Sequence, residues 1–469
     1  MAYEPRIIAY LCTWCSYTGA DTAGIARLKS PANIRDIRVP CSGRVSPELV
    51  MRTFDQGADG VLILGCHIGE CHYDSGNHRA AKRLPILRAL MSYAGLEPER
   101  LRLDWVSASE GERFSRIATE FVDAVRALRP VRWRSAEMAD GERLSAIGHP
   151  STMLPGLTAR AGRASLLSAA GEALEYTGDD CAAKTDAIRA KAKELLASGA
   201  VGYVIGYEVG PRGRTRPSFA NTPEEADRLV WNPDCTYNLT TYLGKKRRPK
   251  VKGIEQPKPV AVVVKPCDSR AINVLLTENQ FTREQVHIIG VTCEGTRHDR
   301  GALQVRCQTC DERVPVVYDT LIGEPPPPVA DRPSPVAEKI AELENATPAG
   351  RMDFWLSQFD RCIRCYACRQ ACPMCNCPVC LYERDDSLWI GMGVNMDEKR
   401  TFHLGRAYHL AGRCVGCNEC ERACPMNIPI SLLNMKLAQE IETAFGHRAG
   451  MTPAPSPIVT VLSGEYKEG

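Results

Sequence analysis

The chain has 469 residues, of which 44% are hydrophobic and 25% charged, as in an ordinary globular protein with buried cores. At one domain per roughly 100–200 residues, this length predicts about three or four domains. A formal net charge of only +3 gives no support for nucleic-acid binding.

The most unusual feature of the composition is its 22 cysteines, which lie in closely spaced groups. Such groups are typical of cofactor ligands in a reducing compartment and not of a disulfide framework. The N-terminus lacks the pattern of a signal peptide, and no apolar run approaches the ~18–20 residues needed to span a bilayer. We therefore expect a cytoplasmic protein without a transmembrane segment.

Residues 1–130 alternate between short apolar runs and amphipathic stretches, which predicts an α/β domain with a parallel sheet and flanking helices. The predicted strands are Ile7–Leu11, Asp36–Val39, Val61–Leu64 and Leu101–Val106. The predicted helices are Pro47–Gln56, Arg83–Ala94 and Glu112–Leu128. In such sheets, ligands bind in the crevice at the carboxyl ends of the strands.

Five cysteines follow three of these strands and should meet in that crevice: Cys12, Cys15, Cys41, Cys66 and Cys71. Cys12-x2-Cys15 alone would suit a thioredoxin-like redox pair, and zinc is a second alternative. Thiols at neighbouring strand ends favour a 2Fe–2S cluster, which needs four of the five. His67 and His72 are better explained as hydrogen-bond donors beside the cluster than as its ligands.

The motifs at these strand ends closely resemble the delta subunit of methyl-viologen-reducing hydrogenase. They include Cys12-Thr-Trp-Cys15, Cys41-Ser-Gly-Arg and Gly65-Cys-His-Ile-Gly-Glu-Cys-His-Tyr73. The resemblance covers about the first 130 residues. It implies a 2Fe–2S cluster and a relay of electrons between a hydrogenase or formate dehydrogenase and a flavin-bifurcating heterodisulfide reductase.

Residues 131–324 form a second predicted α/β region. We expect helices at Leu166–Leu174 and Asp186–Ser198 and a strand at Val201–Ile205, with Gly206–Gly210 after it as a plain turn. Further strands are predicted at Val260–Val264 and His287–Val291.

Four cysteines of this region make one complete predicted site: Cys267, Cys293, Cys307 and Cys310. Four thiolates suit either zinc or a 4Fe–4S cluster. The segment resembles the beta subunit shared by deazaflavin-reducing hydrogenases and formate dehydrogenases, which implies a 4Fe–4S cluster. Those proteins also bind FAD, but their flavin-contacting signature is not found here, so FAD is unsupported.

Residues 325–350 are a predicted proline-rich linker, extended at first and then helical from Val336 to Asn345. Residues 351–445 contain the run Cys-x2-Cys-x2-Cys-x3-Cys-Pro twice, which predicts a two-cluster 4Fe–4S ferredoxin domain of α+β or helical type. In this run the fourth cysteine ligates the other cluster. One cluster is therefore assigned to Cys362, Cys365, Cys368 and Cys424, and the second to Cys414, Cys417, Cys420 and Cys372. Structural zinc would need neither the third cysteine nor the proline.

About forty residues separate the two runs, more than a minimal ferredoxin needs, and they contain Cys375, Cys377 and Cys380. Because exposed spare thiols are reactive, these three are predicted to join an extra metal site with Cys181 or Cys235. A helix within Ile428–Phe445 should cover the second cluster. Residues 446–469 are a predicted C-terminal arm that lies on a partner.

No nucleophile elbow, phosphate loop or HExxH motif is found, so the sequence favours a non-catalytic iron–sulfur electron-transfer subunit. Its expected partners are a heterodisulfide reductase-like flavoprotein and a hydrogenase, formate dehydrogenase or NAD(P)H-oxidising subunit. The alternative is a flavin-containing oxidoreductase that itself oxidises NAD(P)H, formate-derived or deazaflavin electrons. A zinc-stapled scaffold is the third.

Overall fold

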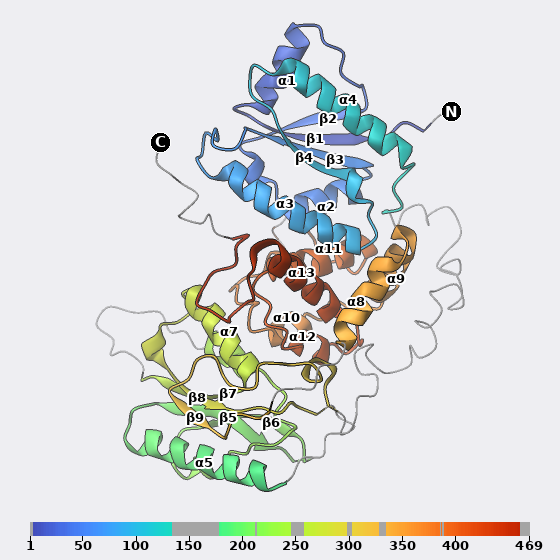
Figure 1. Cartoon of the computed structure of the whole chain (residues 1–469). Coiled ribbons are helices and arrows are strands. Elements are labelled where there is room, and N and C mark those ends of the chain that lie inside the picture. The colour runs from blue at the N-terminus through green and yellow to red at the C-terminus, as the bar shows by residue number, and fades with distance from the viewer. Residues whose placement is uncertain are drawn as a thin grey trace.

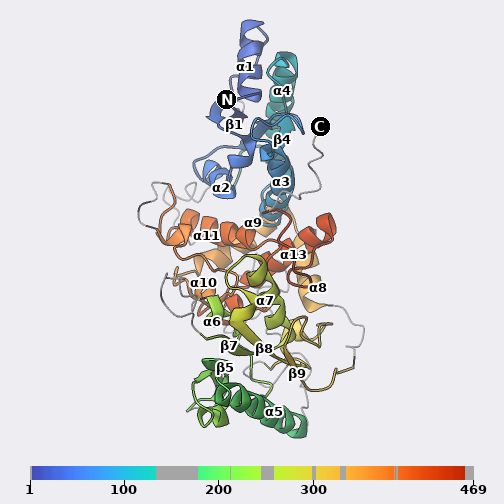
Figure 2. The same ribbon diagram turned by 90° about the vertical axis from the view of Figure 1, so that its left-hand side faces the viewer.

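The computed structural model describes residues 3–133, 178–244, 258–297, 303–327 and 334–459, apart from residues 212, 385, 387 and 388. The helix predicted at 166–174 lies outside these residues. The C-terminal region lies between the N-terminal α/β domain and the middle α/β region, as the two side views show (Figures 1 and 2). The last third of the chain therefore contacts both of the others.

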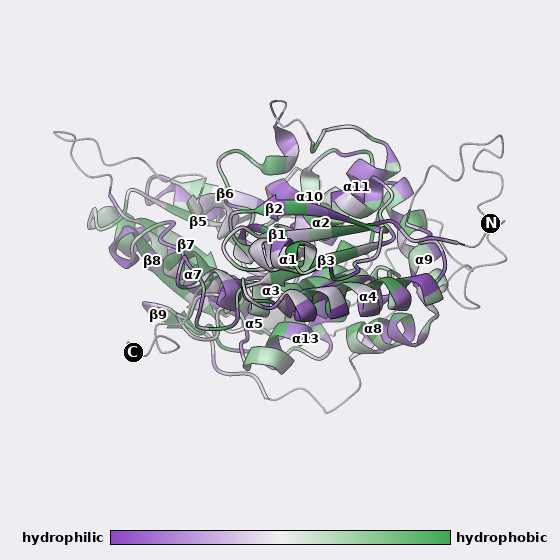
Figure 3. Ribbon diagram, turned by 90° about the horizontal axis from the view of Figure 1, so that it is seen from above, coloured by the Kyte–Doolittle hydropathy of each residue, from purple (hydrophilic) through white to green (hydrophobic). Residues whose placement is uncertain are grey.

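The N-terminal domain contains the predicted parallel sheet, with strand order β2-β1-β3-β4. Its strands are β1 (Ile7–Cys12), β2 (Ile34–Val39), β3 (Gly60–Gly65) and β4 (Leu101–Trp105). β3 lies inside the sheet, is apolar throughout and is buried at every position (Figure 3). A central parallel strand of this kind is covered on both faces.

Two helices cover each face of this sheet: α1 (Ser16–Ile25) and α4 (Gly111–Ala127) on one, α2 (Pro47–Asp55) and α3 (Gly76–Tyr93) on the other (Figure 1). Alternate side chains of β1 face opposite ways, so Leu11 packs in the core with α4, whereas Tyr10 joins the core with α2 and α3. α1 was not predicted because its sequence is polar and rich in small residues.

The middle region has a five-stranded sheet with the order β6-β5-β7-β8-β9, in which only β5 and β6 are antiparallel. Its strands are β5 (Tyr203–Val209), β6 (Thr215–Ala220), β7 (Val260–Val264), β8 (Val286–Val291) and β9 (Thr320–Ile322). α5 (Gly178–Ala197) and α7 (Pro266–Thr277) lie on opposite faces, and α6 (Thr241–Gly244) is short. The turn predicted at Gly206–Gly210 is wrong, because most of that segment continues β5 and pairs with β6.

The described part of the C-terminal region is helical. Its helices are α8 (Pro335–Asn345), α9 (Pro348–Asp360), α10 (Ala367–Ala371), α11 (Met396–His409), α12 (Glu419–Arg422) and α13 (Ile430–Phe445). Ser334 and Thr347 cap α8 and α9, and each is followed by a proline that suits the first helical position. Ile340 and Leu343 of α8 are buried, so the extended spacer is shorter than the predicted linker.

One hydrophobic core joins the N-terminal domain to the C-terminal helices. It includes Phe54 and Leu90 from the first domain, and Trp355, Leu404 and Leu433 from α9, α11 and α13. The indole of Trp355 donates a hydrogen bond to the carbonyl of Tyr93 at 3.1 Å. The C-terminal helices are thus packed onto the first domain and not merely linked to it.

The described part of the C-terminal arm, up to residue 459, lies on the chain itself, and the predicted contact of the arm with a partner stays a prediction. Asn273 of α7 donates to the carbonyl of Gly450 at 3.0 Å, and Arg83 of α3 donates to that of Ile458 at 2.9 Å. The arm thus runs from the middle region to the N-terminal domain. Across the described residues, no helix has the length and apolar character of a membrane span.

Candidate metal centres

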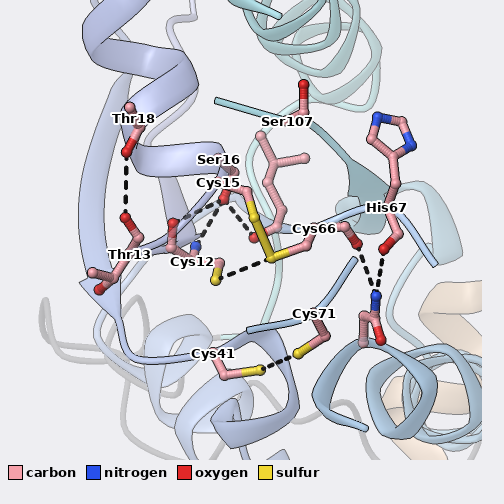
Figure 4. The surroundings of a disulfide bond; sticks show 12 residues. Cys12, Thr13, Cys15, Ser16, Thr18, Cys41, Cys66, His67, Cys71 and Ser107 are labelled. Carbon is pink, nitrogen blue, oxygen red and sulfur yellow. Dashed lines mark hydrogen bonds between the residues drawn. A yellow bond between two sulfur atoms is a disulfide. The ribbon is translucent and has the colours of Figure 1, made fainter. Parts of the chain in front are cut away.

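The five cysteines at the carboxyl edge of the first sheet come together in the structure (Figure 4). The Sγ atoms of Cys12, Cys15 and Cys66 lie within 4.8 Å of one another. The Sγ atoms of Cys12 and Cys66 are 3.7 Å apart, and those of Cys41 and Cys71 are also 3.7 Å apart. The parallel topology predicted this convergence from sequence.

Small and polar residues around these thiols hold the loops in place. A Cβ atom on Gly76 would lie 2.1 Å from Sγ of Cys41, so only glycine fits at the start of α3. Asn77 donates from Nδ2 to the carbonyls of Cys66 and His67, at 3.3 and 2.5 Å. Both residues lie in Ser75-Gly-Asn77, which belongs to the stretch that resembles the hydrogenase delta subunit, but no role was predicted for either.

The structure joins Cys15 and Cys66 in a disulfide, which differs from the expectation that the cysteines are unpaired ligands. Cys12, Cys41 and Cys71 remain as thiols. A hydrogen bond from Cys41 lowers the pKa of Cys12 to about 6, so a thiolate is available there near neutral pH. When Cys15 and Cys66 form a disulfide, only three of the five cysteines remain as thiols. A four-thiolate centre needs one more, so the disulfide and such a centre are mutually exclusive.

The two histidines beside these thiols have other partners. Nε2 of His67 lies 2.6 Å from Oε2 of Glu110, a carboxylate that also accepts the backbone N–H of Ser107. These contacts, the Ser107 N–H foremost, lower the pKa of Glu110. His72 stacks on Trp14, with the ring centroids 3.6 Å apart. That neither histidine is a cluster ligand stays a prediction.

In the C-terminal region, the two near-identical cysteine runs adopt the same backbone winding. Arg364 and Gly416, each two residues after the first cysteine of its run, have φ of 54° and 70°. Tyr366 and Asn418, each four residues after it, have φ of 58° and 60°. Left-handed conformations cost non-glycine residues roughly 1–3 kcal/mol and persist where the surroundings require them. Here they curl each loop around its first three thiols.

The structure places the fourth cysteine of each run beside the thiols of the other run. Cys424 packs with Cys362 and Cys368 in one cluster of buried side chains. Cys372 packs with Cys414 and Cys417 in another. Cys420 of the second run also lies in the first of these clusters, so the two runs adjoin and the assigned exchange of fourth cysteines stays a prediction.

The four cysteines of the middle region line one cavity of about 220 Å³ together with thiols of the second run. The cavity is lined by Cys267, Cys293, Cys307, Cys310, Cys372, Cys414, Cys417 and Cys420. Arg306, which was not singled out from the sequence, donates from Nη1 to Sγ of Cys267 at 3.6 Å. Its pKa is raised well above the ordinary value because the thiolates of Cys307, Cys267 and Cys417 outweigh burial, which alone would lower it.

The remaining thiols are more dispersed. Among the described residues, Cys375, Cys377 and Cys380 do not form a group of three ligand atoms within 4.8 Å, with or without Cys181 or Cys235. Cys375 forms a hydrogen bond with Cys372, and Cys380 packs beside Cys362 and Cys368. Cys235 is wholly buried and accepts the backbone N–H of Asn232 at 3.3 Å.

The donors around the two runs and the middle set fit iron–sulfur clusters. Burial raises the pKa of Cys293, Cys310 and Cys417 to about 12, so a bound cation is needed to hold them as thiolates at neutral pH. In a tetrahedral zinc site, with Zn–S near 2.3 Å, the sulfurs lie about 3.8 Å apart. Among the described residues, no three thiols of these sets approach within 4.8 Å, so the sets are wider than zinc requires.

These features define the protein class as a 4Fe–4S protein with a thiol-bearing α/β domain fused to it. The family described as "4Fe-4S dicluster domain" matches residues 358–428. The family described as "Methyl-viologen-reducing hydrogenase, delta subunit" matches residues 7–129. The chain belongs to this delta-subunit family through its N-terminal domain.

Relatives of known name match the same domain. The iron–sulfur subunit of F420-non-reducing hydrogenase from Archaeoglobus profundus is 46% identical over 131 residues, which are 28% of this chain and 96% of the relative. A subunit of ferredoxin:CoB-CoM heterodisulfide reductase from Methanosarcina mazei is 49% identical over 127 residues, which are 27% of this chain and 16% of the relative. The same domain thus occurs in hydrogenase and in heterodisulfide reductase complexes.

Proposed function

We propose that this chain is a non-catalytic electron-transfer subunit of a cytoplasmic oxidoreductase complex. It relays electrons from a hydrogenase, formate dehydrogenase or NAD(P)H-oxidising subunit to a flavin-bifurcating heterodisulfide reductase-like partner, or in the reverse direction. The names of the relatives, which come from hydrogenase and heterodisulfide reductase complexes, support this pairing of partners.

In this proposal, three thiol sets hold 4Fe–4S clusters: Cys362, Cys365, Cys368 and Cys424; Cys414, Cys417, Cys420 and Cys372; and Cys267, Cys293, Cys307 and Cys310. Four of the five N-terminal thiols hold a 2Fe–2S cluster. Such clusters supply one-electron redox chemistry, and the protein sets their potentials through burial and hydrogen bonds to sulfur.

The observation that carries the proposal is that the thiol sets of the middle region and of the two C-terminal runs lie next to one another. The middle set and the second run line one cavity. The second run in turn adjoins the first. Successive one-electron centres close to one another are the arrangement that a relay requires.

The N-terminal thiols are suited to exchange with a partner because exposed apolar side chains surround them. Trp14 and Tyr73, which flank Cys15 and Cys71, are 47% and 50% exposed, and their rings contact each other edge to face. Aromatic residues are enriched at the centres of protein interfaces. We therefore place the contact with an outside redox partner at this edge of the sheet.

Metal analysis and EPR spectroscopy of the anaerobically purified chain test the proposal. We expect about 14 iron atoms per chain, from one 2Fe–2S and three 4Fe–4S clusters, with reducible paramagnetic signals and no zinc. A colourless, zinc-loaded protein would contradict it. Release of flavin in near-stoichiometric amounts would instead favour the flavin-containing oxidoreductase.

A further inference from the structure

A buried arginine lies between the two cysteine runs of the C-terminal region. Arg406 is on α11, within the insertion that separates the runs, and only 3% of its surface is exposed. Its Nη2 donates a hydrogen bond to the backbone carbonyl of Cys368 at 3.0 Å. This contact fixes the guanidinium against the first run.

The rest of this guanidinium has no oxygen acceptor among the described residues, and its side chain is hydrogen-bonded to the thiol of Cys375, which neither cluster assignment uses. Nε and Nη1 of Arg406 are buried without an oxygen acceptor, and no carboxylate of a described residue lies within ion-pair distance of it. Burial of an unpaired cation is strongly unfavourable, and buried donors are nearly always satisfied. The site is therefore built for a negative group that accepts hydrogen bonds.

The thiols nearest to this guanidinium come from both runs. The thiolates of Cys375, Cys368, Cys372 and Cys420 outweigh burial, which alone would lower the pKa of Arg406, and they raise it well above its ordinary value. Cys368 belongs to the first assigned cluster, whereas Cys372 and Cys420 belong to the second. One positive charge thus faces the ligands of two centres.

We propose that Arg406 is a counter-charge shared by the two 4Fe–4S centres, one that raises the reduction potentials of both. This inference rests on the proposed function, because it presumes that both centres form. A tetrathiolate 4Fe–4S cluster is an anion that gains one negative charge when it accepts an electron. A fixed cation and N–H donors beside its sulfurs therefore stabilise the reduced form more than the oxidised form.

The electron balance is simple. One centre loses one electron and its neighbour gains it, while the guanidinium keeps its charge and no proton moves. Because the same cation acts on both centres, it would shift both potentials in the same direction and leave the free energy of transfer between them little changed. Arg406 is thus a positioning residue of the relay: it sets energies and does not itself carry electrons.

The test compares four forms of the full-length chain, purified anaerobically: wild type, R406M, R406K and R384M. R406M removes the positive charge and the N–H donors with little change in side-chain length. R406K keeps the charge but loses the planar guanidinium with its set of N–H donors. R384M removes the same kind of charge from an exposed position of the same insertion, where Arg384 pairs with Asp386. Potentials are measured by EPR-monitored redox titration, with iron content determined on each sample.

In R406M we expect both C-terminal centres to be reduced at lower potential than in wild type, by at least tenfold in the ratio of reduced to oxidised cluster at fixed potential. For a one-electron couple, this ratio corresponds to about 59 mV. R406K should fall between R406M and wild type. The C-terminal centres of R384M should titrate as in wild type. The N-terminal 2Fe–2S centre, whose EPR signal persists to higher temperature, should titrate in the variants as it does in wild type.

A shift in only one centre, or none, would overturn the inference while leaving the proposed function intact. An equal shift in R384M would overturn it too, because the effect would then be one of net charge. A wild-type chain that takes up no iron would overturn both. If R406M binds less iron than wild type, the polar R406Q variant replaces it, and the same order of potentials is expected.

Discussion

Asp55 at the end of α2 and Arg400 on α11 form a buried ion pair between the N-terminal domain and the insertion of the C-terminal region. Their side chains are 0% and 2% exposed. Asp55 also accepts hydrogen bonds from the indole of Trp133 at 3.0 Å and from the hydroxyl of Thr401 at 3.1 Å. The insertion between the two cysteine runs therefore has a structural role: it attaches the first domain to the domain that contains the runs.

We expect D55A to lower the free energy of unfolding by up to about 3–5 kcal/mol, because the substitution leaves the buried Arg400 guanidinium with only the partly exposed Asp397 as its carboxylate partner. Anaerobic urea denaturation of the iron-loaded chain measures this change. D123A is the matched control, since Asp123 pairs with Arg126 on the exposed face of α4 and should cost about 1 kcal/mol or less. Equal effects of the two substitutions would show that the buried pair contributes no more to the free energy of unfolding than the exposed pair.

G76A should remove the N-terminal centre selectively. The added Cβ would lie 2.1 Å from Sγ of Cys41 and 3.1 Å from Sγ of Cys71, so the thiols must move apart. We expect the loss of about two irons and of the 2Fe–2S signal, while the 4Fe–4S signals remain. G24A, at a position in α1 where nothing lies within 4 Å of the new Cβ, should keep all the iron. Full iron content in G76A would contradict the assigned site.

Iron removal should determine whether Cys15 and Cys66 are paired. In the iron-loaded chain we expect no disulfide, because a 2Fe–2S cluster needs four of the five N-terminal thiols. After chelation in air, Cys15 and Cys66 should pair, since they are the two thiols that the structure joins. Differential alkylation followed by peptide mass spectrometry distinguishes the two states. A Cys15–Cys66 disulfide in fully iron-loaded protein would show that this site holds no such cluster.

C293A should cost the chain about four irons, because Cys293 lines the cavity with the other middle-region thiols. C235A is the matched control in the same region: Cys235 is buried but does not line that cavity. Iron and zinc are quantified in both variants. Loss of metal from C235A would instead favour the predicted extra site with Cys375, Cys377 and Cys380.

The elements with strong apolar periodicity could be predicted from the sequence, and with them the meeting of five thiols at one edge. β3 and β7 are nearly continuous apolar runs, and the parallel order follows from the helices between them. The doubled cysteine run also predicts which fourth cysteine goes with which loop, because its spacing leaves few other choices, and this assignment stays a prediction.

Other features depend on contacts between distant residues and leave little local signal. Arg406 and Asp55 look like ordinary charged positions on amphipathic helices, and only tertiary packing buries them. Tyr366 gave no sign of its left-handed conformation, whereas Asn418 is of a residue type that adopts this conformation more readily. β9 is a three-residue strand whose pairing with β8 alone defines it.

The core shared by α2, α3, α9, α11 and α13 has a consequence for how such a complex is held together. In the Archaeoglobus profundus relative the matched domain makes up nearly the whole polypeptide, so nothing covalent keeps a neighbour on that face. In the present chain the polypeptide itself tethers the C-terminal helices to this face. The effective concentration of tethered partners typically reaches the millimolar range. Dilution that would dissociate a separate chain from this face should leave the fused helices bound to it.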